Sequence, residues 1–496
     1  MDKWTKEMII EADIALLQAA MEAGELSAAD CVRWYLERIE RFNPKLKAVL
    51  EVNPDAIAEA EALDSERRDS GARGPLHGIP IMLKDNIDTG DRMHTSAGSV
   101  ALADHFAPKD SFAAAQLRAA GAVFLGKANM TEWANFMSST MWAGYSSRGG
   151  LTLNPYGPGE LFVGGSSSGP GAAVAANLCA AAIGTETSGS IISPSSQNCL
   201  VGLKPTIGLV SRSGIIPITQ SQDSAGPMTR TVRDAAILLG ALTAVDSEDA
   251  SMLMDGREAY ADYTRFLDPD GLRAARIGIP RQYYRDLDQA RLAIIERAIA
   301  LCKECGATIV DPVSLPCENA KWDWDVMRYE FKKGLNDYLA QAGAGASVRS
   351  LDELIAYNER HRDSALKYGQ NLLIGANETS GLLTEPVYTE SLRLNREVAR
   401  NQGIDHAIRE HRLDALLFLG NEEGLDLSAR AGYPALTVPG GFARTGVIAE
   451  GGYTTKGPQG ITFVGTAYSE PALFRLAYAY ECASHYRFAP ADSHLL

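Results

Sequence analysis

The chain has 496 residues, of which 46% are hydrophobic and 22% charged, so it is long enough to bury a large core. Acidic residues outnumber basic ones by 62 to 47, and the formal net charge is -15. A protein that neutralises nucleic-acid phosphates needs clustered Lys and Arg, and no such cluster is present. We therefore expect no nucleic-acid partner.

The sequence shows neither a targeting segment nor a membrane span. Residues 1–7 lack the apolar stretch of a signal peptide. No uninterrupted apolar run approaches the roughly 18 residues that a transmembrane helix needs. We expect a cytoplasmic protein that does not bind membranes.

The seven cysteines are scattered along the chain and odd in number, which is not typical of a disulfide framework. Cys302 and Cys305 form a C-x-x-C pair, a spacing that redox sites also use. These two cysteines continue the apolar helical face of Leu292, Ile295 and Ile299. We therefore predict that they pack in the core.

The elements expected from the sequence change in character near residue 73. Residues 1–72 are predicted to form a helical segment, in which residues 27–30 form a capping box before the helix over 31–39. A second helix is expected over residues 55–68. This segment should pack on the remainder of the chain, residues 73–496.

Beyond residue 73, short apolar runs alternate with helical stretches. The runs fit buried strands and the stretches fit amphipathic helices, which is typical of a layered α/β fold with a largely buried sheet. No internal repeat or low-complexity linker divides the chain, so we expect one large domain. The expected strands are residues 79–83, 122–125, 180–183, 277–279 and 415–419, and the expected helices include 232–245 and 289–304.

Two glycine- and serine-rich turns frame an alanine-rich helix and a strand. Residues 164–171 read Gly-Gly-Ser-Ser-Ser-Gly-Pro-Gly, and residues 184–190 read Gly-Thr-Glu-Thr-Ser-Gly-Ser. The first turn does not fit a phosphate loop, because no Gly-Lys-Ser/Thr follows it. Such turns allow a close backbone approach, so the two turns could meet in space.

The first turn also contains a G-x-S-x-G pattern centred on Ser167, as in an α/β-hydrolase. In that interpretation Ser167 is the nucleophile of an esterase, and His406 or His411 would be its base. Each histidine sits in a charged, helix-like stretch that a solvated helix face explains more simply, so neither is a convincing base. A flexible loop is a third interpretation of the same turn.

Lys84 offers a different base for a serine nucleophile, because it ends the apolar run of residues 79–83. To accept a proton near pH 7, its pKa must fall about 3 units from roughly 10.4, a differential of about 4 kcal/mol. Burial among apolar residues and hydroxyls would supply that change. A salt bridge to Asp85 would oppose it, so Asp85 should point elsewhere.

These turns belong to a series of separated motifs. The series comprises Gly-Pro-Leu-His-Gly-Ile-Pro-x-x-x-Lys-Asp at residues 74–85, the two turns, Gly-Leu-Lys-Pro-Thr at 202–206 and the stretch 223–234. In this order the motifs resemble the amidase signature family of serine amidases, over about residues 74–486. The stretch 148–156 resembles bacterial peptide amidases in particular.

The resemblance implies a fold and a mechanism. The fold would be a single large amidase-signature domain with a mixed, largely buried central β-sheet covered by helices on both faces. Ser190 would attack the amide carbonyl and form an acyl-enzyme, Ser166 would relay the proton, and Lys84 would accept it. The resemblance also implies a cis peptide bond between Gly165 and Ser166, and a mechanism without a cofactor.

The resemblance implies an oxyanion hole made by the backbone N–H groups of Thr187, Ser188, Gly189 and Ser190. The sequence departs from the common family pattern at Ser188, where many members carry glycine or aspartate. It departs again at Ile192, where many carry arginine. The chemistry is expected to survive both changes and substrate preference to be affected, and an ordinary core isoleucine is an equal alternative for Ile192.

The implied reaction is hydrolysis of a primary amide, a peptide C-terminal amide, an anilide or a carbamate. The partner would be a small-molecule or peptide amide, and the protein a monomer or homodimer. The A-type glutaminase subunit of a tRNA-dependent amidotransferase resembles the same motifs and remains an alternative. No residue set shows metal-ligand spacing, and His77 is interpreted as structural. Selectivity is expected in residues 136–145, 322–375 and 421–433.

Overall fold

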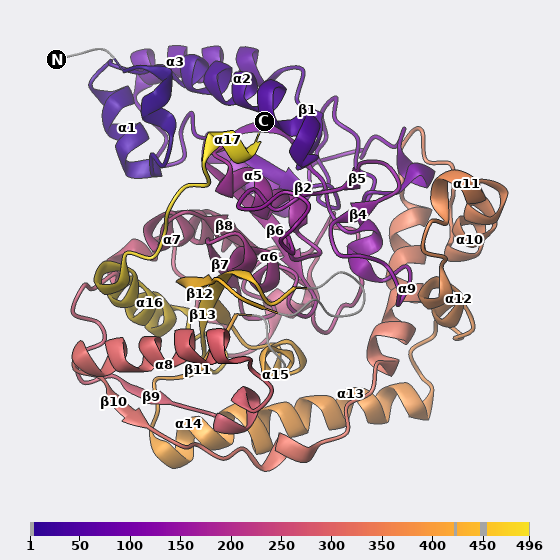
Figure 1. The fold of residues 1–496 in the computed structure, drawn as a ribbon. Helices are drawn as coiled ribbons and strands as arrows, with labels where there is room; N and C mark the ends of the chain where they lie inside the picture. The colour runs from indigo at the N-terminus through magenta and orange to yellow at the C-terminus, as the bar shows by residue number, and fades with distance from the viewer. Residues whose placement is uncertain (1–3, 421–423, 447–453, 496) are drawn as a thin grey trace.

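The strands of the computed structural model form one long sheet through the middle of the molecule (Figure 1). The structure describes residues 4–420, 424–446 and 454–495. In spatial order, the eleven strands found in this part of the chain are β1 (Val49–Val52), β3 (Val123–Ala128), β2 (Pro80–Lys84), β6 (Ala181–Glu186), β8 (Ser224–Thr229), β7 (Val201–Lys204), β12 (Ala435–Ala443), β13 (Gly457–Val464), β11 (Ala415–Leu419), β9 (Arg276–Gly278) and β10 (Thr308–Val310). A separate pair is formed by β4 (Tyr145–Ser146) and β5 (Gly150–Leu151).

The sheet is mixed, as expected. Strand β2 runs parallel to both of its neighbours, β3 and β6, and β9 runs parallel to β10 and β11. The strands between these two groups pair antiparallel. The five strands predicted from apolar runs are all present, because such runs fit a sheet that is buried on both faces.

Helices cover both faces of the sheet. On β11, Leu416 and Phe418 belong to the same core cluster as Ile192 of α6 (Ile192–Gln197). The alternate residues Leu417 and Leu419 belong to the cluster that includes α8 (Gln289–Glu304) and α16 (Glu470–Ser484). Successive side chains of a strand point to opposite faces, so these helices lie on opposite sides. The remaining helices near the sheet are α4 (Phe112–Ala119), α5 (Ser168–Ala175), α7 (Val232–Leu242), α14 (Asp405–His411) and α15 (Leu425–Ala431).

The N-terminal segment is helical except for one strand. Its helices are α1 (Ile14–Glu22), α2 (Ala28–Leu46) and α3 (Ala56–Ser70), and the Ser27 hydroxyl caps α2 by accepting from Asp30 N at 3.0 Å. Between α2 and α3, β1 pairs antiparallel with β3 and forms the edge of the central sheet. The segment predicted to be helical therefore also contains a strand that was not predicted, and a domain boundary at residue 72 stays a prediction. The helix α17 (Asp492–Leu495) packs against this segment, since it lies beside α2 (Figure 1) and Asp492 pairs with Arg38 at 3.2 Å.

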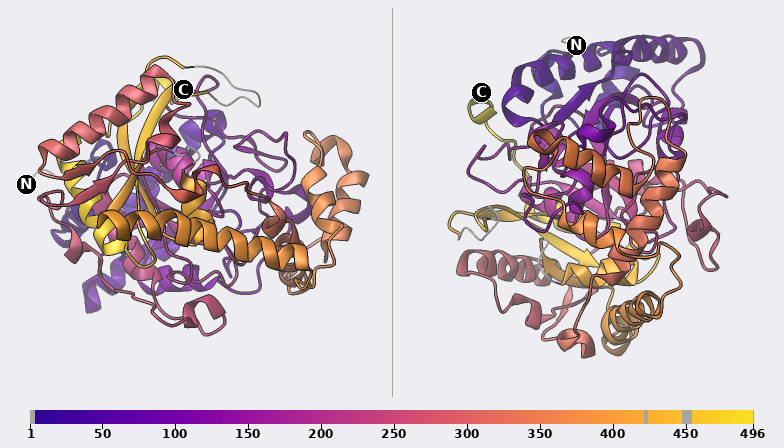
Figure 2. Two further views of the ribbon diagram at one scale, coloured as in Figure 1. Left: turned by 90° about the horizontal axis from the view of Figure 1, so that it is seen from below. Right: turned by 90° about the vertical axis from the view of Figure 1, so that its right-hand side faces the viewer.

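A second group of helices stands to one side of the sheet (Figure 2). Its members are α9 (Asp325–Ala340), α10 (Leu351–Arg360), α11 (Arg362–Ala365), α12 (Asn371–Asn377) and α13 (Pro386–Ala399). Phe331 and Leu335 of α9 share a core with Phe136 and Met137, which follow β3. This contact places the helical group beside the carboxyl ends of β2, β3 and β6.

The remaining short helical turns are η1 (Lys6–Ile9), η2 (Val100–Leu102), η3 (Glu132–Asn135), η4 (Ala250–Leu253), η5 (Thr264–Phe266), η6 (Arg281–Tyr284), η7 (Pro316–Asn319) and η8 (Arg400–Ile404). All seven cysteines are unpaired, and Cys302 is buried in the core with Cys305 packed against it, as predicted. Within the described ranges, no helix combines the length and the apolar character that crossing a membrane requires.

Candidate active site

Lys84 is the last residue of β2, and its side chain is completely buried. Its Nζ lies 2.8 Å from Ser166 Oγ, 2.9 Å from Thr185 Oγ1 and 3.1 Å from Thr185 O. Burial lowers the pKa of Lys84 to about 7, against the opposing effect of the negative charges of Asp223 and Glu186. Because β2 runs parallel beside β6, the ends of the two strands bring Lys84 and Thr185 together.

Asp85 points away from the amine of Lys84, as expected. Its carboxylate accepts hydrogen bonds from the Ser96 hydroxyl and, at 2.9 Å, from Gly98 N. Arg148 lies 3.5 Å from the other carboxylate oxygen. The charge of Asp85 is thus held on the far side of the strand end, where it does not form an ion pair with Lys84.

Ser166 lies in the tight turn that leads into α5. The peptide bond between Gly165 and Ser166 is cis, as predicted. Gly164 before it has φ 75°, and a Cβ at this position would lie 2.6 Å from Pro194 Cα, so the turn needs glycine here. The Ser166 carbonyl accepts from Thr131 N at 3.0 Å, which fixes the turn against the segment after β3.

Ser190 lies between the end of β6 and the start of α6, beside the Ser166 turn. Ser167 N donates to Ser190 O at 3.1 Å and fastens the two glycine-rich turns together. The prediction that these turns meet is confirmed. Ser190 is 8% exposed, and no hydrogen bond joins its hydroxyl to Ser166 in the part of the chain that the structure describes. The structure therefore brings Lys84 and Ser166 into direct contact, and the Ser190 carbonyl is bonded to Ser167, the residue after Ser166.

The carboxylate of Glu186 organises the loop that carries Ser190. It accepts from Gly189 N at 2.9 Å, from Ile191 N at 2.7 Å and from Ile192 N at 2.9 Å. Anionic groups are favoured at the N-terminus of a helix, and this one faces the start of α6. Glu186 was not among the residues predicted from the sequence. The signal available in the sequence was the single charged residue of residues 184–190, whose other side chains are small and uncharged.

In this arrangement, one of the N–H groups predicted for the oxyanion hole is already bonded. Gly189 N–H already donates to Glu186, so it is not free in this structure. The N–H groups of Thr187, Ser188 and Ser190 have no intramolecular acceptor among the described residues. Three candidate donors therefore remain where four were expected.

Ser167 is placed unfavourably for a nucleophile. It is completely buried, its hydroxyl donates to Thr185 O at 3.0 Å, and it accepts from Thr185 N at 3.2 Å. His406 and His411 lie on α14, at the opposite end of the molecule from α5 (Figure 1). This geometry contradicts the esterase interpretation. The sequence could not show it, because hydrophobic periodicity does not reveal that the Ser167 hydroxyl faces the strand.

The two departures from the family pattern have different surroundings. Ile192 is fully buried in a core cluster, as the core alternative predicted, whereas Ser193, the next residue, lines a cavity beside Ser188. Ser188 lines that cavity, and its hydroxyl donates to Asp426 Oδ1 at 2.8 Å. The expected influence on substrate preference thus fits Ser188 but not Ile192.

Two cavities are lined by different residues of the loop 185–190. The first, which we call the α15 cavity, has a volume of about 590 Å³ and is lined by Gly165, Ser188 and Gly189. Its other walls come from α15 and the segment before α9. All three segments predicted to carry selectivity contribute to it, through Ala143, Trp322 and Leu425, although residues 421–423 lie outside the described ranges.

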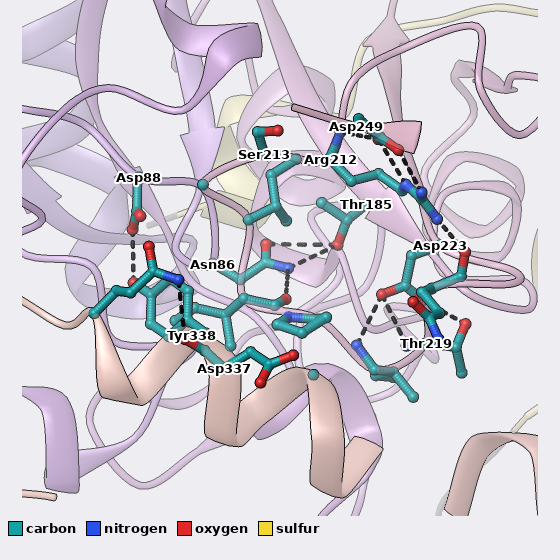
Figure 3. A pocket seen from close by; sticks show the side chains of 18 of the residues that line it. Asn86, Asp88, Thr185, Arg212, Ser213, Thr219, Asp223, Asp249, Asp337 and Tyr338 are labelled. Atoms are coloured by element: carbon teal, nitrogen blue, oxygen red, sulfur yellow. Dashed lines mark hydrogen bonds and ion pairs between the residues drawn. The ribbon is translucent and has the colours of Figure 1, made fainter. Parts of the chain in front are cut away.

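The second cavity, which we call the α9 cavity, has a volume of about 500 Å³ and contacts Asn86, Thr185 and Thr187 (Figure 3). Helix α9 forms its opposite wall. Several of its polar side chains bond to one another. Tyr338 donates to Asp88 at 2.7 Å, Arg212 pairs with Asp249 at 2.6 Å, and Asp223 accepts from Thr219 at 3.1 Å.

His77 is structural, as interpreted: it is buried, and its Nε2 lies 2.9 Å from Leu63 O. Among the residues that the structure describes, no group of three or more His, Cys, Asp or Glu side chains could hold a metal ion.

The fold and these motifs define an amide-bond hydrolase. The chain matches the model of the Amidase family over residues 30–418 and belongs to that family. It is an amidase, a hydrolase that cuts C–N amide bonds.

Three relatives place the chain within the family. It is similar to the solved structure of a peptide amidase from Stenotrophomonas maltophilia, with 46% identity, a TM-score of 0.87, and coverage of 97% of this chain and 98% of that one. It is 38% identical over 493 residues to a probable amidase of Arabidopsis thaliana, covering 97% of this chain and 92% of the relative. It is 32% identical over 501 residues to the A-type subunit of the glutamyl-tRNA(Gln) amidotransferase of Syntrophobacter fumaroxidans, covering 95% and 96%.

Proposed function

We propose that the protein hydrolyses a linear carboxamide through an acyl-enzyme on Ser190, with Ser166 and Lys84 transferring the proton. A serine hydroxyl is a weak nucleophile and needs a base. The observation that carries the proposal is the buried amine of Lys84, whose pKa is about 7, at 2.8 Å from Ser166 Oγ. Near neutral pH a substantial fraction of this amine is uncharged and able to accept a proton.

The contacts of Lys84 support an orientation for the neutral amine. A neutral amine has two N–H groups and one lone pair. Thr185 supplies two oxygens, its carbonyl at 3.1 Å and its hydroxyl at 2.9 Å. If both N–H groups bond to Thr185, the lone pair points at the Ser166 hydroxyl. Thr185 is then a positioning residue for the base.

The proposed reaction proceeds in two halves. Ser190 Oγ attacks the carbonyl carbon as Ser166 takes its proton and passes its own to Lys84. The negative charge on the carbonyl oxygen is stabilised by the N–H groups of Thr187, Ser188 and Ser190, each worth a few kcal/mol of barrier. Lys84 returns the proton through Ser166 to the leaving nitrogen, the C–N bond breaks, and water then hydrolyses the ester by the same relay. Hydrogen bonds of this kind often tighten only when substrate is bound.

The experiment is ammonia or amine release by the purified protein from primary amides, anilides, carbamates and peptide amides. Ser190→Ala should lower kcat by at least about 10³-fold, because the covalent step is lost. Ser167→Ala and His406→Ala should each retain substantial activity. Full activity in Ser190→Ala would refute the proposal. Loss of activity in Ser167→Ala and His406→Ala, with Lys84→Ala unaffected, would restore the esterase interpretation.

The amidotransferase subunit is the second candidate, supported by the 32% identity to such a subunit over 95% of this chain. Against it stands the 46% identity to the peptide amidase. Glutamine as the best substrate, or activity that depends on added partner chains, would favour the amidotransferase.

A further inference from the structure

Two residues beyond Lys84, the side chain of Asn86 is held in one orientation by the backbone of Ile216. The N–H of Ile216 donates to Asn86 O at 2.8 Å, and Asn86 Nδ2 donates in return to Ile216 O at 3.2 Å. Asn86 is 2% exposed. Only the nitrogen of an amide group can donate to a carbonyl, so this contact decides which end of the side chain faces Ile216.

The same amide group contacts the hydroxyl of Thr185 (Figure 3). Asn86 Nδ2 donates to Thr185 Oγ1 at 3.0 Å, and Thr185 Oγ1 donates to Asn86 Oδ1 over a longer distance of 3.5 Å. Lys84 Nζ lies 2.9 Å from the same hydroxyl oxygen. A hydroxyl has one hydrogen to donate and two lone pairs that accept. Lys84 and Asn86 together account for all three.

The direction of the Thr185 hydrogen decides what the neutral amine of Lys84 can do. If this hydrogen points at Lys84 Nζ, it occupies the lone pair that must receive the proton of Ser166. If it points at Asn86 Oδ1, the hydroxyl accepts an N–H from Lys84, and the lone pair remains available. Apart from Lys84 Nζ, Asn86 Oδ1 is the only acceptor for this hydrogen in the described part of the chain.

The second orientation also suits the amine after it has taken the proton. Protonated Lys84 has three N–H groups, and three oxygens lie around it: Ser166 Oγ at 2.8 Å, Thr185 Oγ1 at 2.9 Å and Thr185 O at 3.1 Å. Thr185 Oγ1 then accepts from Lys84 in both protonation states, and its hydrogen does not have to turn during the reaction. Groups that keep their orientation while charge develops avoid a reorganisation cost.

We propose that Asn86 is a positioning residue of the proton relay, which acts on Lys84 through the Thr185 hydroxyl. It directs the hydroxyl hydrogen away from the amine and keeps the lone pair of Lys84 aimed at Ser166. In the described part of the chain, its side-chain hydrogen bonds go to Thr185 and to one backbone carbonyl. The inference rests on the proposed function, in which Lys84 is the base for Ser190.

The test is a double-mutant cycle with Asn86→Ala and Thr185→Val, measured on the most rapidly cleaved amide of the substrate screen. Each single variant should lower kcat about 10-fold with KM unchanged, because the base loses its orientation and the contacts of the substrate are kept. The double variant should also lose about 10-fold, since no hydroxyl is left for Asn86 to direct. Independent losses that multiply to about 100-fold would overturn the inference.

Asn86→Leu separates hydrogen bonding from packing. Leucine is close to asparagine in shape, but its side chain neither donates nor accepts a hydrogen bond. Asn86→Leu should therefore lower kcat as much as Asn86→Ala does, again with KM unchanged. Full activity in Asn86→Leu would mean that the side chain only fills space, and the inference would be wrong.

Asn53→Ala is the matched control for a folding defect. Asn53 is also 2% exposed and follows a strand of the same sheet, and its Nδ2 donates to Phe124 O at 2.8 Å. This variant loses a buried amide group away from Lys84 and should keep its kcat. An equal loss in Asn53→Ala and Asn86→Ala would overturn the inference and leave the proposed function intact. Full activity in Ser190→Ala would instead refute the proposed function.

Discussion

Two strands of the same sheet end in a buried lysine, and only one of these two lysines contacts a hydroxyl that could give it a proton. Lys84 ends β2 and Lys204 ends β7, and both side chains are completely buried. Burial lowers the pKa of Lys84 to about 7 and that of Lys204 to about 8. By burial and pKa alone, the two amines are nearly alike.

The difference lies in the atoms that each amine meets. Lys204 donates to two backbone carbonyls, Tyr433 O at 2.7 Å and Pro205 O at 3.1 Å, which have no proton to give. Lys84 meets one carbonyl and two hydroxyls, one of which belongs to the turn beside the nucleophile. A lowered pKa therefore marks a buried amine, and Lys84 is a candidate base because one of its hydroxyl partners, Ser166, belongs to the turn beside Ser190.

The sharpest test of this comparison exchanges each lysine for methionine. Lys84→Met should lower kcat by about 10²–10⁴-fold, the usual contribution of a positioned base. Lys204→Met should leave kcat within about threefold, because its amine meets no exchangeable proton. Initial rates on a good amide substrate measure both. Similar losses in the two variants would mean that burial, rather than the hydroxyl partner, defines the function.

The same variants should differ in stability. An amine whose pKa falls on folding destabilises the folded state. The destabilisation is largest at pH values below the pKa in the folded state, and it disappears as the pH rises toward 10.5, the pKa of a free lysine. Lys84→Met should therefore raise the free energy of unfolding by about 1–3 kcal/mol at pH 7, and by less at pH 9. Lys204→Met should gain less, because it leaves two carbonyls without a donor. Denaturant unfolding at the two pH values measures this, and a Lys84→Met protein that loses stability would contradict it.

The positioning role of Thr185 gives a smaller effect. Thr185→Val removes the hydroxyl that lies 2.9 Å from Lys84 Nζ but keeps the shape and the carbonyl. We expect kcat to fall about 10-fold with KM unchanged, because the amine of Lys84 loses its orientation while the contacts of the substrate are kept. Thr462→Val is the matched control, since that buried hydroxyl donates to Gly420 O at 2.9 Å on another strand. A change in KM alone would argue that Thr185 acts on substrate binding.

The smallest expected effect is a shift in pH dependence. Lys84 must be uncharged to act as a base, so kcat/KM should fall as pH drops below about 7. The negative charge of Asp223 raises the pKa of Lys84, and Asp223→Asn should therefore move the acid limb to lower pH, by less than about one unit. Asp249→Asn, in the same α9 cavity but paired with Arg212, should leave the limb in place. A shift to higher pH in Asp223→Asn would contradict the assignment of the limb to Lys84.

The sequence predicted five of the eleven described strands of the sheet and named Lys84, Ser166 and Ser190 as candidate residues, for different reasons. Strands buried on both faces leave continuous apolar runs, so β2, β3 and β6 could be found without a structure. The three polar residues were found through separated motifs in one order. The direction of Asp85 followed from the requirement that Lys84 be uncharged, and the structure agrees.

Where sequence reasoning failed, the missing information was contact geometry. The G-x-S-x-G pattern offered Ser167 as an alternative nucleophile, but the structure shows that the Ser167 hydroxyl bonds to Thr185. Four N–H groups were expected to be available beside Ser190, and Glu186 occupies one of them. Strand β1 escaped notice because an edge strand with charged residues has no continuous apolar run.

The sequence by itself determined the class of chemistry and the alternation of strands and helices, because residue type and period are properties of the chain alone. The tertiary structure decided which hydroxyl faces the buried amine and which N–H groups remain unbonded. It also decided that Asp426 on α15, 238 positions beyond Ser188, lines the same cavity. Those outcomes depend on which segments become neighbours in space, and the direction of a side chain is fixed only once its partners are in place.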